Sequence, residues 1–419
     1  MVPGARTHRP PPGGRSMTGG TVAGSATLCV HGGTPPDPQT GALVPPLVQS
    51  TTYAWPDLDH PPAITYARAG NATVEALERR LAALEGGGDA VCFGSGLAAI
   101  DAVLRSLPDG ARVVAGRHLY GGTTRLIRRL HASRLRVDEV DSTDAGLLEA
   151  ALGSPADLVL VETPSNPTLR ITDLRRGARA AHAAGALFAV DNTFLTPLYQ
   201  RPLDLDADLS IHSTTKYLDG HDATLGGAVV VHERHAGKGD SPTGPLAARL
   251  RWIRKASGSV LAPFEAWLTL QGSKTLHLRT REQWATAARI AAVARDHPAV
   301  GRVHYPGLAA HPGHSVHRGQ ATGDGGIVAL DLGDIESARE FVSALRVFTI
   351  AENLGATESI ATHPASMTHA DLAPERRRED GITDGLVRLS AGVEDPGDLE
   401  ADVAQALDLA RRQRREVVA

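Results

Sequence analysis

The sequence predicts an α/β protein, in which a domain built on a mostly parallel β-sheet is followed by a smaller α+β domain. Short apolar runs rich in Val, Ile and Leu alternate with helical stretches through much of the chain. Buried parallel strands have this continuous apolar character because helices cover both faces of their sheet. The chain has 419 residues, which is enough for two such domains and a terminal arm.

Two segments with little periodicity precede the first long helix. Residues 1–24 are rich in Pro, Gly, Arg and Thr and lack the apolar middle of a signal peptide, so a disordered extension is expected. Residues 25–72 are expected to form an N-terminal arm, because the stretch 32–63 is rich in Pro and Thr and shows little periodicity. An extended arm needs a surface to dock on, and a partner subunit is the expected one.

Residues 73–264 are predicted to form the α/β domain. Its first helix is indicated by Val74, Leu77 and Leu81, which recur at helix spacing, and it ends at the glycines 86–88. The apolar runs that follow are strands separated by helices. Strands are expected at 90–93, 112–115, 158–161, 187–190, 209–211 and 227–231, and helices at 97–107, 123–130 and 175–184.

Residues 265–419 are predicted to form the smaller α+β domain, which follows a linker at 237–245. Its first segment, 266–296, is largely helical with an interruption at Gly272. The remaining elements are strands at 326–331, 347–350 and 385–390, and helices at 335–345 and 396–414.

The composition excludes several classes of protein. Hydrophobic residues make up 42% and charged residues 21% of the chain, which is ordinary for a soluble globular protein. A net charge of −4 gives no basis for binding nucleic acid or a membrane surface, and no apolar run is long enough to span a membrane. Cys29 and Cys92 are the only cysteines, so no disulfide framework is possible and the cytoplasm is the expected location. No metal site is expected.

Lys216 carries the most chemical information in the sequence. It closely follows Ser213 and Thr215, and Asp191 stands upstream at the end of an apolar run. A lysine that forms a Schiff base with pyridoxal phosphate (PLP) needs a carboxylate for the pyridine nitrogen and hydroxyls for the phosphate. These residues supply the required groups. An ordinary surface lysine is the alternative interpretation of Lys216.

Each supporting residue also has a structural alternative. Asp191 is expected at the carboxyl end of a parallel strand, where ligands bind in open α/β sheets, although turn and cap aspartates occur there too. Ser213 and Thr215 would share one face of an extended segment and reach one phosphate, or form a polar strand end. Gly96 and Leu97 open a helix whose N-terminal N–H groups can meet a phosphate, or they belong to a simple cap.

Tyr120 is a candidate for stacking on the cofactor ring. It precedes Gly121 and Gly122 at a predicted junction between a strand and a helix. Glycines remove crowding beside the tyrosine, so a flat ring has room to stack on it. A tyrosine that belongs to the core or to a turn is the alternative.

The chain resembles the Cys/Met-metabolism PLP-dependent enzymes, which include cystathionine γ-synthase, cystathionine γ- and β-lyase and methionine γ-lyase. The resemblance extends from about His31 to the last helix. It implies fold type I, the PLP-dependent aminotransferase-like fold, with a mostly parallel sheet of the seven-stranded type. The matching segments are 66–73, 94–97, 120–123, 162–168, 191–194, 213–216, 220–222, 305–308, 363–369 and 387–394.

The resemblance implies a role for each matching residue. Lys216 would hold PLP and shuttle protons, Asp191 would pair with the ring nitrogen, and Tyr120 would stack on the ring and assist proton transfer. Arg388 would grip the substrate carboxylate as a bidentate fork, whereas the alternative is a surface residue of a strand. The other implied contacts are with the phosphate (Gly96, Leu97, Ser213, Thr215), with the phosphate of the neighbouring subunit (Tyr66, Arg68), with the ring hydroxyl (Asn166) and with the substrate (Tyr66, Glu352, Asn353). The active unit would be a homodimer, usually paired into a homotetramer.

The chemistry that the resemblance implies uses the PLP ring as an electron sink. Lys216 takes the α-proton, a β-proton then leaves, and a γ-leaving group departs. Water then gives ammonia and a 2-oxo acid, whereas an added nucleophile gives a new amino acid. Elimination and replacement share their first half, so both endings stay open.

Glu352 favours one branch of this family. Cystathionine γ-synthases and γ-lyases typically have Glu at this position, whereas methionine γ-lyases have an apolar residue there and commonly Cys in place of Gly122. An acid at position 352 can bind the distal ammonium of cystathionine, although a solvated charge is the alternative. The expected enzyme therefore acts in transsulfuration on cystathionine or an O-acyl homoserine.

Two departures from the family pattern keep other members in consideration. The usual Ser before Leu-Gly is Asn353, and the usual Pro after Asn71 is Ala72. A bulkier amide near the substrate favours an unusual γ-substituted amino acid and a specialised pathway. Methionine γ-lyase is a further alternative.

Two rival classes differ more widely. An aminotransferase would need a second carboxylate-binding arginine and lacks these motifs. A non-catalytic binding or assembly protein of the same fold would be expected to lose Lys216, Asp191 or Arg388, all of which are present.

Overall fold

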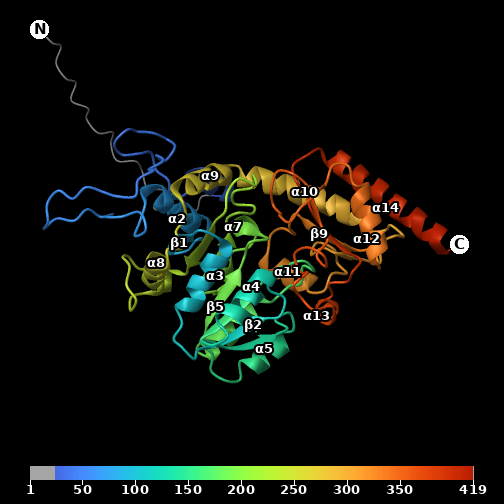
Figure 1. Ribbon diagram of the computed structural model, residues 1–419, viewed down its shortest axis with the longest axis horizontal. Helices are drawn as coiled ribbons and strands as arrows, with labels where there is room; N and C mark the ends of the chain where they lie inside the picture. The colour runs from blue at the N-terminus through green and yellow to red at the C-terminus, as the bar shows by residue number, and fades with distance from the viewer. Residues whose placement is uncertain (1–23, 419) are drawn as a thin grey trace, which may run out of the picture.

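The computed structural model describes residues 24–418 and contains two β-sheets, each with helices packed against it (Figure 1). Nearly all of the predicted extension, residues 1–24, lies outside the described residues. The larger sheet has strand order β1-β7-β6-β5-β4-β2-β3. Its strands are β1 (Asp89–Phe93), β2 (Arg112–Gly116), β3 (Arg136–Val140), β4 (Leu158–Glu162), β5 (Leu187–Asp191), β6 (Leu209–Ser213) and β7 (Gly227–Val231).

The larger sheet is mostly parallel, as predicted. Its neighbouring strands run parallel except for β7, which is antiparallel to both β1 and β6. The strand predicted at 227–231 is therefore present, and it is the antiparallel member of the sheet. The connection 214–226 contains turns and no helix, so the chain reverses direction instead of crossing over to a parallel position. This reversal places Lys216 at the carboxyl end of β6.

Helices cover both faces of the larger sheet, and side chains alternate between the two layers. Val91 and Phe93 pack into the same apolar cluster as the side chains of α3, whereas Cys92 packs into the cluster on the side of α2. Both clusters consist of buried residues, which explains the continuous apolar runs in the sequence. The helices are α2 (Ala72–Glu85), α3 (Gly96–Arg105), α4 (Gly121–Arg125), the π-helix 126–130, α5 (Ala145–Ala151), α6 (Leu174–Ala183), α7 (Thr196–Tyr199), α8 (Leu246–Ser257) and short 3-10 turns at 202–205 and 233–235.

The smaller sheet has strand order β10-β11-β12-β9-β8 and packs against three long helices. Its strands are β8 (Arg302–His304), β9 (Ile327–Asp331), β10 (Thr349–Ile350), β11 (Ile360–Thr362) and β12 (Leu386–Ser390). The helices of this part are α9 (Pro263–Lys274), α10 (Leu276–Arg295), α11 (His314–Gln320), α12 (Ile335–Ala344), α13 (Pro374–Glu379) and α14 (Pro396–Val418). Among residues 24–418, no helix combines the length and the apolar character that crossing a membrane requires.

Gly272 does not interrupt the helical segment as predicted. It lies inside α9, and the break falls at Thr275 between α9 and α10. A Cβ atom at position 272 would lie 2.1 Å from the carbonyl oxygen of Asp219. The glycine is therefore needed for close approach between α9 and the connection that carries Lys216, and not to end a helix.

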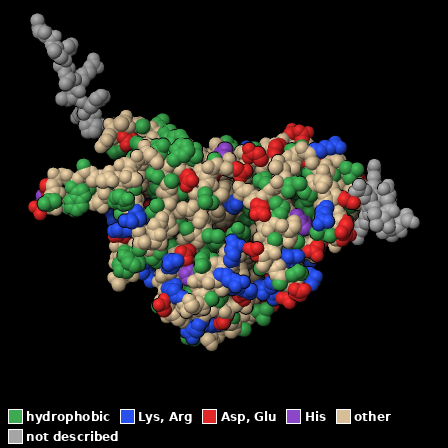
Figure 2. Space-filling model, viewed as in Figure 1, with side chains coloured by type: hydrophobic (Ala, Val, Ile, Leu, Met, Phe, Trp, Pro, Cys, Tyr) green, Lys and Arg blue, Asp and Glu red, His purple; other side chains and the backbone are tan. Residues whose placement is uncertain are grey.

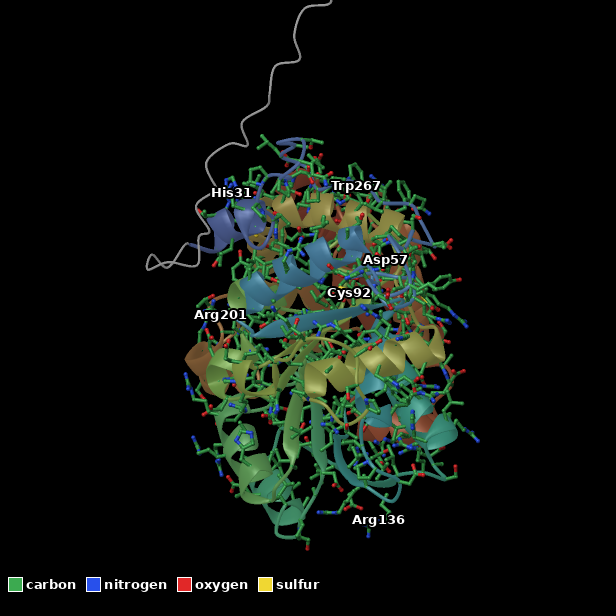
Figure 3. The ribbon with its side chains drawn as sticks, turned by 90° about the vertical axis from the view of Figure 1, so that its left-hand side faces the viewer. His31, Asp57, Cys92, Arg136, Arg201 and Trp267 are labelled. Carbon is green, nitrogen blue, oxygen red and sulfur yellow. The ribbon has the colours of Figure 1, made fainter. Side chains whose placement is uncertain are left out.

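The N-terminal arm packs on its own subunit at its beginning and again at 45–48, where the carbonyl oxygen of Pro45 accepts from Trp267 of α9 and that of Pro46 from Thr73 of α2. Helix α1 (Ser25–His31) lies beside α9 (Figure 3). The buried Arg80 donates to the carbonyl oxygens of Val30 and Gly32. The following loops project from the body of the molecule and expose apolar side chains (Figure 2). The most exposed of them is Leu58, with 91% of its surface accessible. Contact between this arm and a partner subunit remains a prediction.

The start of α2 shows how the chain accommodates Ala72. The Asn71 side chain caps the helix by accepting from the N–H groups of Thr73 (2.9 Å) and Val74 (3.3 Å). Ala72 is the first helical residue, a position that favours proline, and Asn71 has the extended backbone that a residue before proline needs (φ −151°, ψ 132°).

We therefore expect Ala72→Pro to increase the free energy of unfolding by about 0.4–1 kcal/mol, because proline restricts the unfolded chain. The midpoint of urea denaturation measures this change. A midpoint lower than that of the unsubstituted protein would contradict the description of this helix start.

Candidate active site

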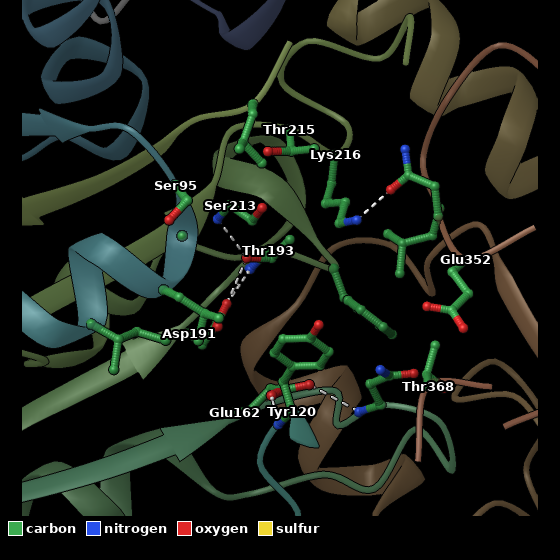
Figure 4. Close-up of a pocket in the computed structure, with 18 of the residues that line it drawn as sticks. Ser95, Tyr120, Glu162, Asp191, Thr193, Ser213, Thr215, Lys216, Glu352 and Thr368 are labelled. Atoms are coloured by element: carbon green, nitrogen blue, oxygen red, sulfur yellow. Dashed lines mark hydrogen bonds between the residues drawn. The ribbon is translucent and has the colours of Figure 1, made fainter. Parts of the chain in front are cut away.

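The candidate site lies at the carboxyl ends of three neighbouring parallel strands. Glu162 ends β4, Asp191 ends β5 and Ser213 ends β6, and Glu162 and Asp191 are paired in register. Ligands bind at this edge in open α/β sheets because loops there surround a shared crevice. All three residues line one pocket, shown in Figure 4.

Both parts of the protein contribute to this pocket. It contains every predicted site residue except Tyr66 and Arg68: Gly96, Leu97, Tyr120, Asn166, Asp191, Ser213, Thr215, Lys216, Glu352, Asn353 and Arg388. The prediction assigned no role to several further lining residues, namely Ser95, Ile100, Glu162, Thr193, Phe194, Leu225, Leu354 and Thr368. Among these, Glu162 had a usable signal, because it follows an apolar strand just as Asp191 does.

Asp191 is held by a single neighbour that binds it twice. Its Oδ1 accepts from the backbone N–H of Thr193 (3.1 Å) and from the hydroxyl of Thr193 (2.6 Å). Loss of water raises the pKa of the carboxyl group, while the hydrogen bonds from Thr193 and the nearby His212 oppose this rise. A cationic N–H group placed in the pocket would compensate for the lost solvation of the carboxylate.

Glu162 connects Tyr120 and Asn166 beneath the pocket. Its carboxyl oxygens accept from the backbone N–H of Tyr120 (2.7 Å) and from that of Asn166 (2.9 Å). Burial, together with the neighbouring Asp191, raises the pKa of Glu162 well above its ordinary value. Glu162 is therefore a positioning group for two lining residues.

The start of α3 faces the hydroxyl side of the pocket. Ser95 caps this helix by accepting from Ala98 N–H (3.1 Å), which leaves neighbouring N–H groups at the helix end. A Cβ atom at Gly96 would lie 3.0 Å from the Cβ of Ser213, so glycine permits the close approach. Free N–H groups, a helix dipole and hydroxyls form a suitable cradle for phosphate.

Ser213 and Thr215 reach this cradle by a route that differs from the predicted one. The extended segment ends at Ser213, and Thr215 belongs to a turn, so the two side chains do not share one face of a strand. The hydroxyl of Thr215 also donates to the carbonyl of Gly226 (3.2 Å) and accepts from its N–H (3.0 Å). The turn brings both hydroxyls to the same pocket nonetheless.

Lys216 projects into the pocket, where its Nζ donates to Oδ1 of Asn353 (Figure 4). Burial lowers the pKa of its amine to about 8, with a further contribution from the positive charge of Arg388. Near neutral pH a significant fraction of this amine is therefore unprotonated, as a nucleophile or a base must be. The alternative of an ordinary surface lysine does not fit this position.

Arg388, on β12, is only 2% exposed, which rules out the alternative of a surface strand residue. Its guanidinium donates to Oδ1 of Asn166 (2.9 Å), to the carbonyl of Asn353 (2.9 Å) and to the hydroxyl of Thr362 (3.0 Å). Its Nε–H is buried without a protein acceptor among the described residues. Burial lowers the pKa of the guanidinium to about 10, so the group stays charged at neutral pH and can receive an anion.

Tyr66 and Arg68 lie outside the pocket of their own chain. They belong to the arm, where the Arg68 guanidinium lies 5.3 Å from the centre of the Tyr66 ring. Tyr66 is 46% exposed. The structure therefore does not bring these two predicted residues to the site within one chain.

The groups in the pocket fit PLP. A carboxylate, a phosphate cradle, an amine of lowered pKa and an exposed aromatic ring at Tyr120 correspond to the ring nitrogen, phosphate, aldehyde and face of the cofactor. Bound there, PLP would supply an electron sink for reactions at the α-carbon of an amino acid. The agreement rests on the donor set and on the phosphate cradle at Gly96.

Comparisons with a family profile, with curated proteins and with solved structures agree on one family. A profile of the family described as "Cys/Met metabolism PLP-dependent enzyme" matches residues 26–408. Cystathionine gamma-lyase of Bacillus subtilis is 42% identical over 384 residues, covering 91% of this chain and 98% of the relative. Cystathionine beta-lyase of Lactococcus lactis is 40% identical over 383 residues, with coverage of 91% and 98%. The crystal structure of cystathionine gamma synthase from Xanthomonas oryzae in complex with cystathionine is similar with a TM-score of 0.88 and 42% identity, covering 94% of this chain and all of that chain.

Proposed function

Because the chain belongs to the Cys/Met metabolism family of PLP-dependent enzymes, we propose that it catalyses γ-elimination or γ-replacement on cystathionine or an O-acyl homoserine. The observation that carries this proposal is the charge arrangement of one pocket. Arg388 supplies a buried cation, and Glu352 supplies an exposed carboxylate in the same lining. A substrate with an α-carboxylate and a distal ammonium has complementary charges.

The proposed mechanism assigns each protein group one task. Arg388 binds the α-carboxylate of the substrate and fixes the orientation of the α-carbon. The amine of Lys216, whose pKa is about 8, accepts the α-proton and carries it within the pocket. Asp191 would hold the ring nitrogen of PLP in its protonated form and Tyr120 would cover the ring face, and PLP would supply the electron sink when bound.

Gly122 supports a cystathionine-type enzyme over a methionine γ-lyase. A Cβ atom at this position would lie 2.4 Å from Cε1 of Tyr120, so any side chain there would displace the tyrosine ring. The cysteine that is common in methionine γ-lyases therefore does not fit the present Tyr120 conformation. The polar side chain of Glu352 is likewise a poor neighbour for a methyl thioether.

We further propose that the active unit is a homodimer and that two homodimers pair into a homotetramer. Tyr66 and Arg68 lie on a projecting arm outside the pocket of their own chain. Apolar side chains such as Leu43 and Trp55 are exposed along the same arm. A neighbouring subunit would cover these side chains, and the arm would then supply Tyr66 and Arg68 to the phosphate of that neighbour.

The cytoplasm is the proposed location. Cys29 and Cys92 are buried free thiols that belong to the apolar core. Such thiols persist in a reducing compartment, which is consistent with this location.

The experiment offers the purified enzyme cystathionine, methionine and O-acyl homoserines, with and without cysteine, and identifies the products by mass spectrometry. We expect γ-chemistry, in which cystathionine releases cysteine and 2-oxobutanoate, or O-acyl homoserine plus cysteine gives cystathionine. Homocysteine and pyruvate from cystathionine would instead show β-elimination, and the proposal would be wrong. Turnover of methionine alone would favour the alternative member of the family.

Glu352→Gln tests the proposed contact between Glu352 and the distal ammonium of cystathionine. It should raise the KM for cystathionine about fivefold, the size expected for one solvent-exposed ion pair. The KM for an O-acyl homoserine, which lacks the distal ammonium, should stay unchanged.

A further inference from the structure

One amide side chain, that of Asn353, connects the pocket lysine to a carboxylate outside the pocket lining. Lys216 Nζ donates to Oδ1 of Asn353, and Nδ2 of Asn353 donates to Oδ1 of Asp222. The three residues come from different parts of the fold, because Lys216 and Asp222 lie between β6 and β7 and Asn353 follows β10. We propose that Asp222 is a positioning residue that fixes the amide of Asn353 and thereby holds the Lys216 amine in place for proton transfer.

The chemistry of the side chains determines the direction of these bonds. An ionised carboxylate only accepts hydrogen bonds, so Asn353 must turn its NH₂ group toward Asp222. The amide oxygen is then directed at Lys216, which must be the donor. Without the carboxylate, the amide can rotate and direct its own NH₂ group at the lysine, where two donors oppose each other.

Asn353 is also held through its backbone. Its carbonyl oxygen accepts from Arg388 Nη2 at 2.9 Å. Asn353 therefore contacts two functional residues. Its backbone binds Arg388, the proposed carboxylate-binding residue, and its side chain binds Lys216, the proposed base. A change at Asp222 acts on the lysine while leaving the contact between Asn353 and Arg388 in place.

The backbone at Asp222 indicates which substitution is informative. Asp222 has φ 52°, in the left-handed region that Asp and Asn tolerate better than other side chains. Asp222→Asn therefore keeps both the size of the side chain and the backbone conformation. It changes only the hydrogen bonding at position 222, because a carboxylate can only accept a hydrogen bond whereas an amide can donate or accept one.

The experiment measures exchange of the α-proton of L-alanine in deuterated water by the holoenzyme, using NMR. Alanine has no γ-leaving group, so exchange reports on the proton transfer by Lys216 alone; the inference rests on that part of the proposed function. At saturating alanine, Asp222→Asn should slow exchange about tenfold, equivalent to ~1.4 kcal/mol. The cofactor absorbance and the alanine concentration for half-saturation should be unchanged.

Asn353→Ser supplies the matched background. A serine hydroxyl both donates and accepts, so it can accept from Lys216 whatever stands at position 222. Asp222→Asn should therefore change the exchange rate less than about twofold in this background, since the two substitutions remove one shared contact. Equal slowing in both backgrounds, or no slowing in either, would overturn the proposal.

The pH profile of the wild-type enzyme gives a second test that needs no change at Asp222. Loss of water raises the pKa of Asp222, the hydrogen bond from Asn353 lowers it, Glu358 and Asp219 raise it, and Lys216 lowers it. Protonation turns the carboxyl into a donor, so exchange should fall as the pH drops through this pKa. Asn353→Ser should remove that acid limb, and an unchanged limb would contradict the role of Asp222.

These outcomes are separate from those that test the proposed function. An enzyme that exchanges the α-proton of alanine, yet converts none of the γ-substituted amino acids, would refute the proposed function. The positioning role of Asp222 would then still be decided by the two backgrounds.

Discussion

Lys216→Ala is expected to lower turnover of every amino-acid substrate by at least ~10³-fold, because it removes both the nucleophile and the general base. No other lysine can take over. The chain has four lysines, and the other three, Lys238, Lys255 and Lys274, do not line the pocket. Steady-state kinetics at saturating substrate measures the loss.

Lys238→Ala is the matched control, because Lys238 is exposed and does not line the pocket. Its turnover should equal that of the unsubstituted enzyme. Retention of normal rates by Lys216→Ala would mean that this lysine is neither the anchor nor the base.

Arg388→Lys is expected to raise the KM for amino-acid substrates about 100-fold, since it removes a fork of charge-assisted hydrogen bonds. An ammonium keeps the charge but cannot satisfy two carboxylate oxygens in parallel. It also cannot reach Asn166, Thr362 and the Asn353 carbonyl together, as the guanidinium does. Titration of the cofactor absorbance with substrate measures the affinity.

The cofactor absorbance without substrate should be unchanged in Arg388→Lys, because the phosphate cradle and Asp191 are intact. Arg378→Lys, on the exposed helix α13, is the control and should have no effect. Unaltered substrate affinity in Arg388→Lys would refute the carboxylate role.

The sequence allowed the larger sheet to be predicted well because its strands are buried on both faces. β4 is entirely buried and apolar apart from Glu162, so the run itself identifies the strand. β3 was missed because it is a partly exposed edge strand in which Arg136, Asp138 and Glu139 are charged. The short strands β8 and β11 were also missed, because three residues are too few for a periodic signal, whereas β10 lies inside the predicted strand 347–350.

The sequence predicted the positions of those pocket residues that lie at the ends of strands. Asp191 and Ser213 end neighbouring strands, so their meeting was predictable from topology. The contacts of Asn353 were not, because Lys216, Asp222 and Asn353 meet through a turn and a loop whose paths depend on packing between the two parts of the protein. The tight approach of Gly272 to Asp219 is of the same kind.

The most direct test of the central claim is borohydride reduction of the yellow holoenzyme, followed by proteolysis and mass spectrometry. The predicted result is one phosphopyridoxyl group, found on the peptide that contains Lys216, with the peptides of Lys238, Lys255 and Lys274 unmodified. The label on one of those three lysines, or a protein that remains colourless and unlabelled after incubation with PLP, would contradict the assignment of Lys216 as the cofactor lysine.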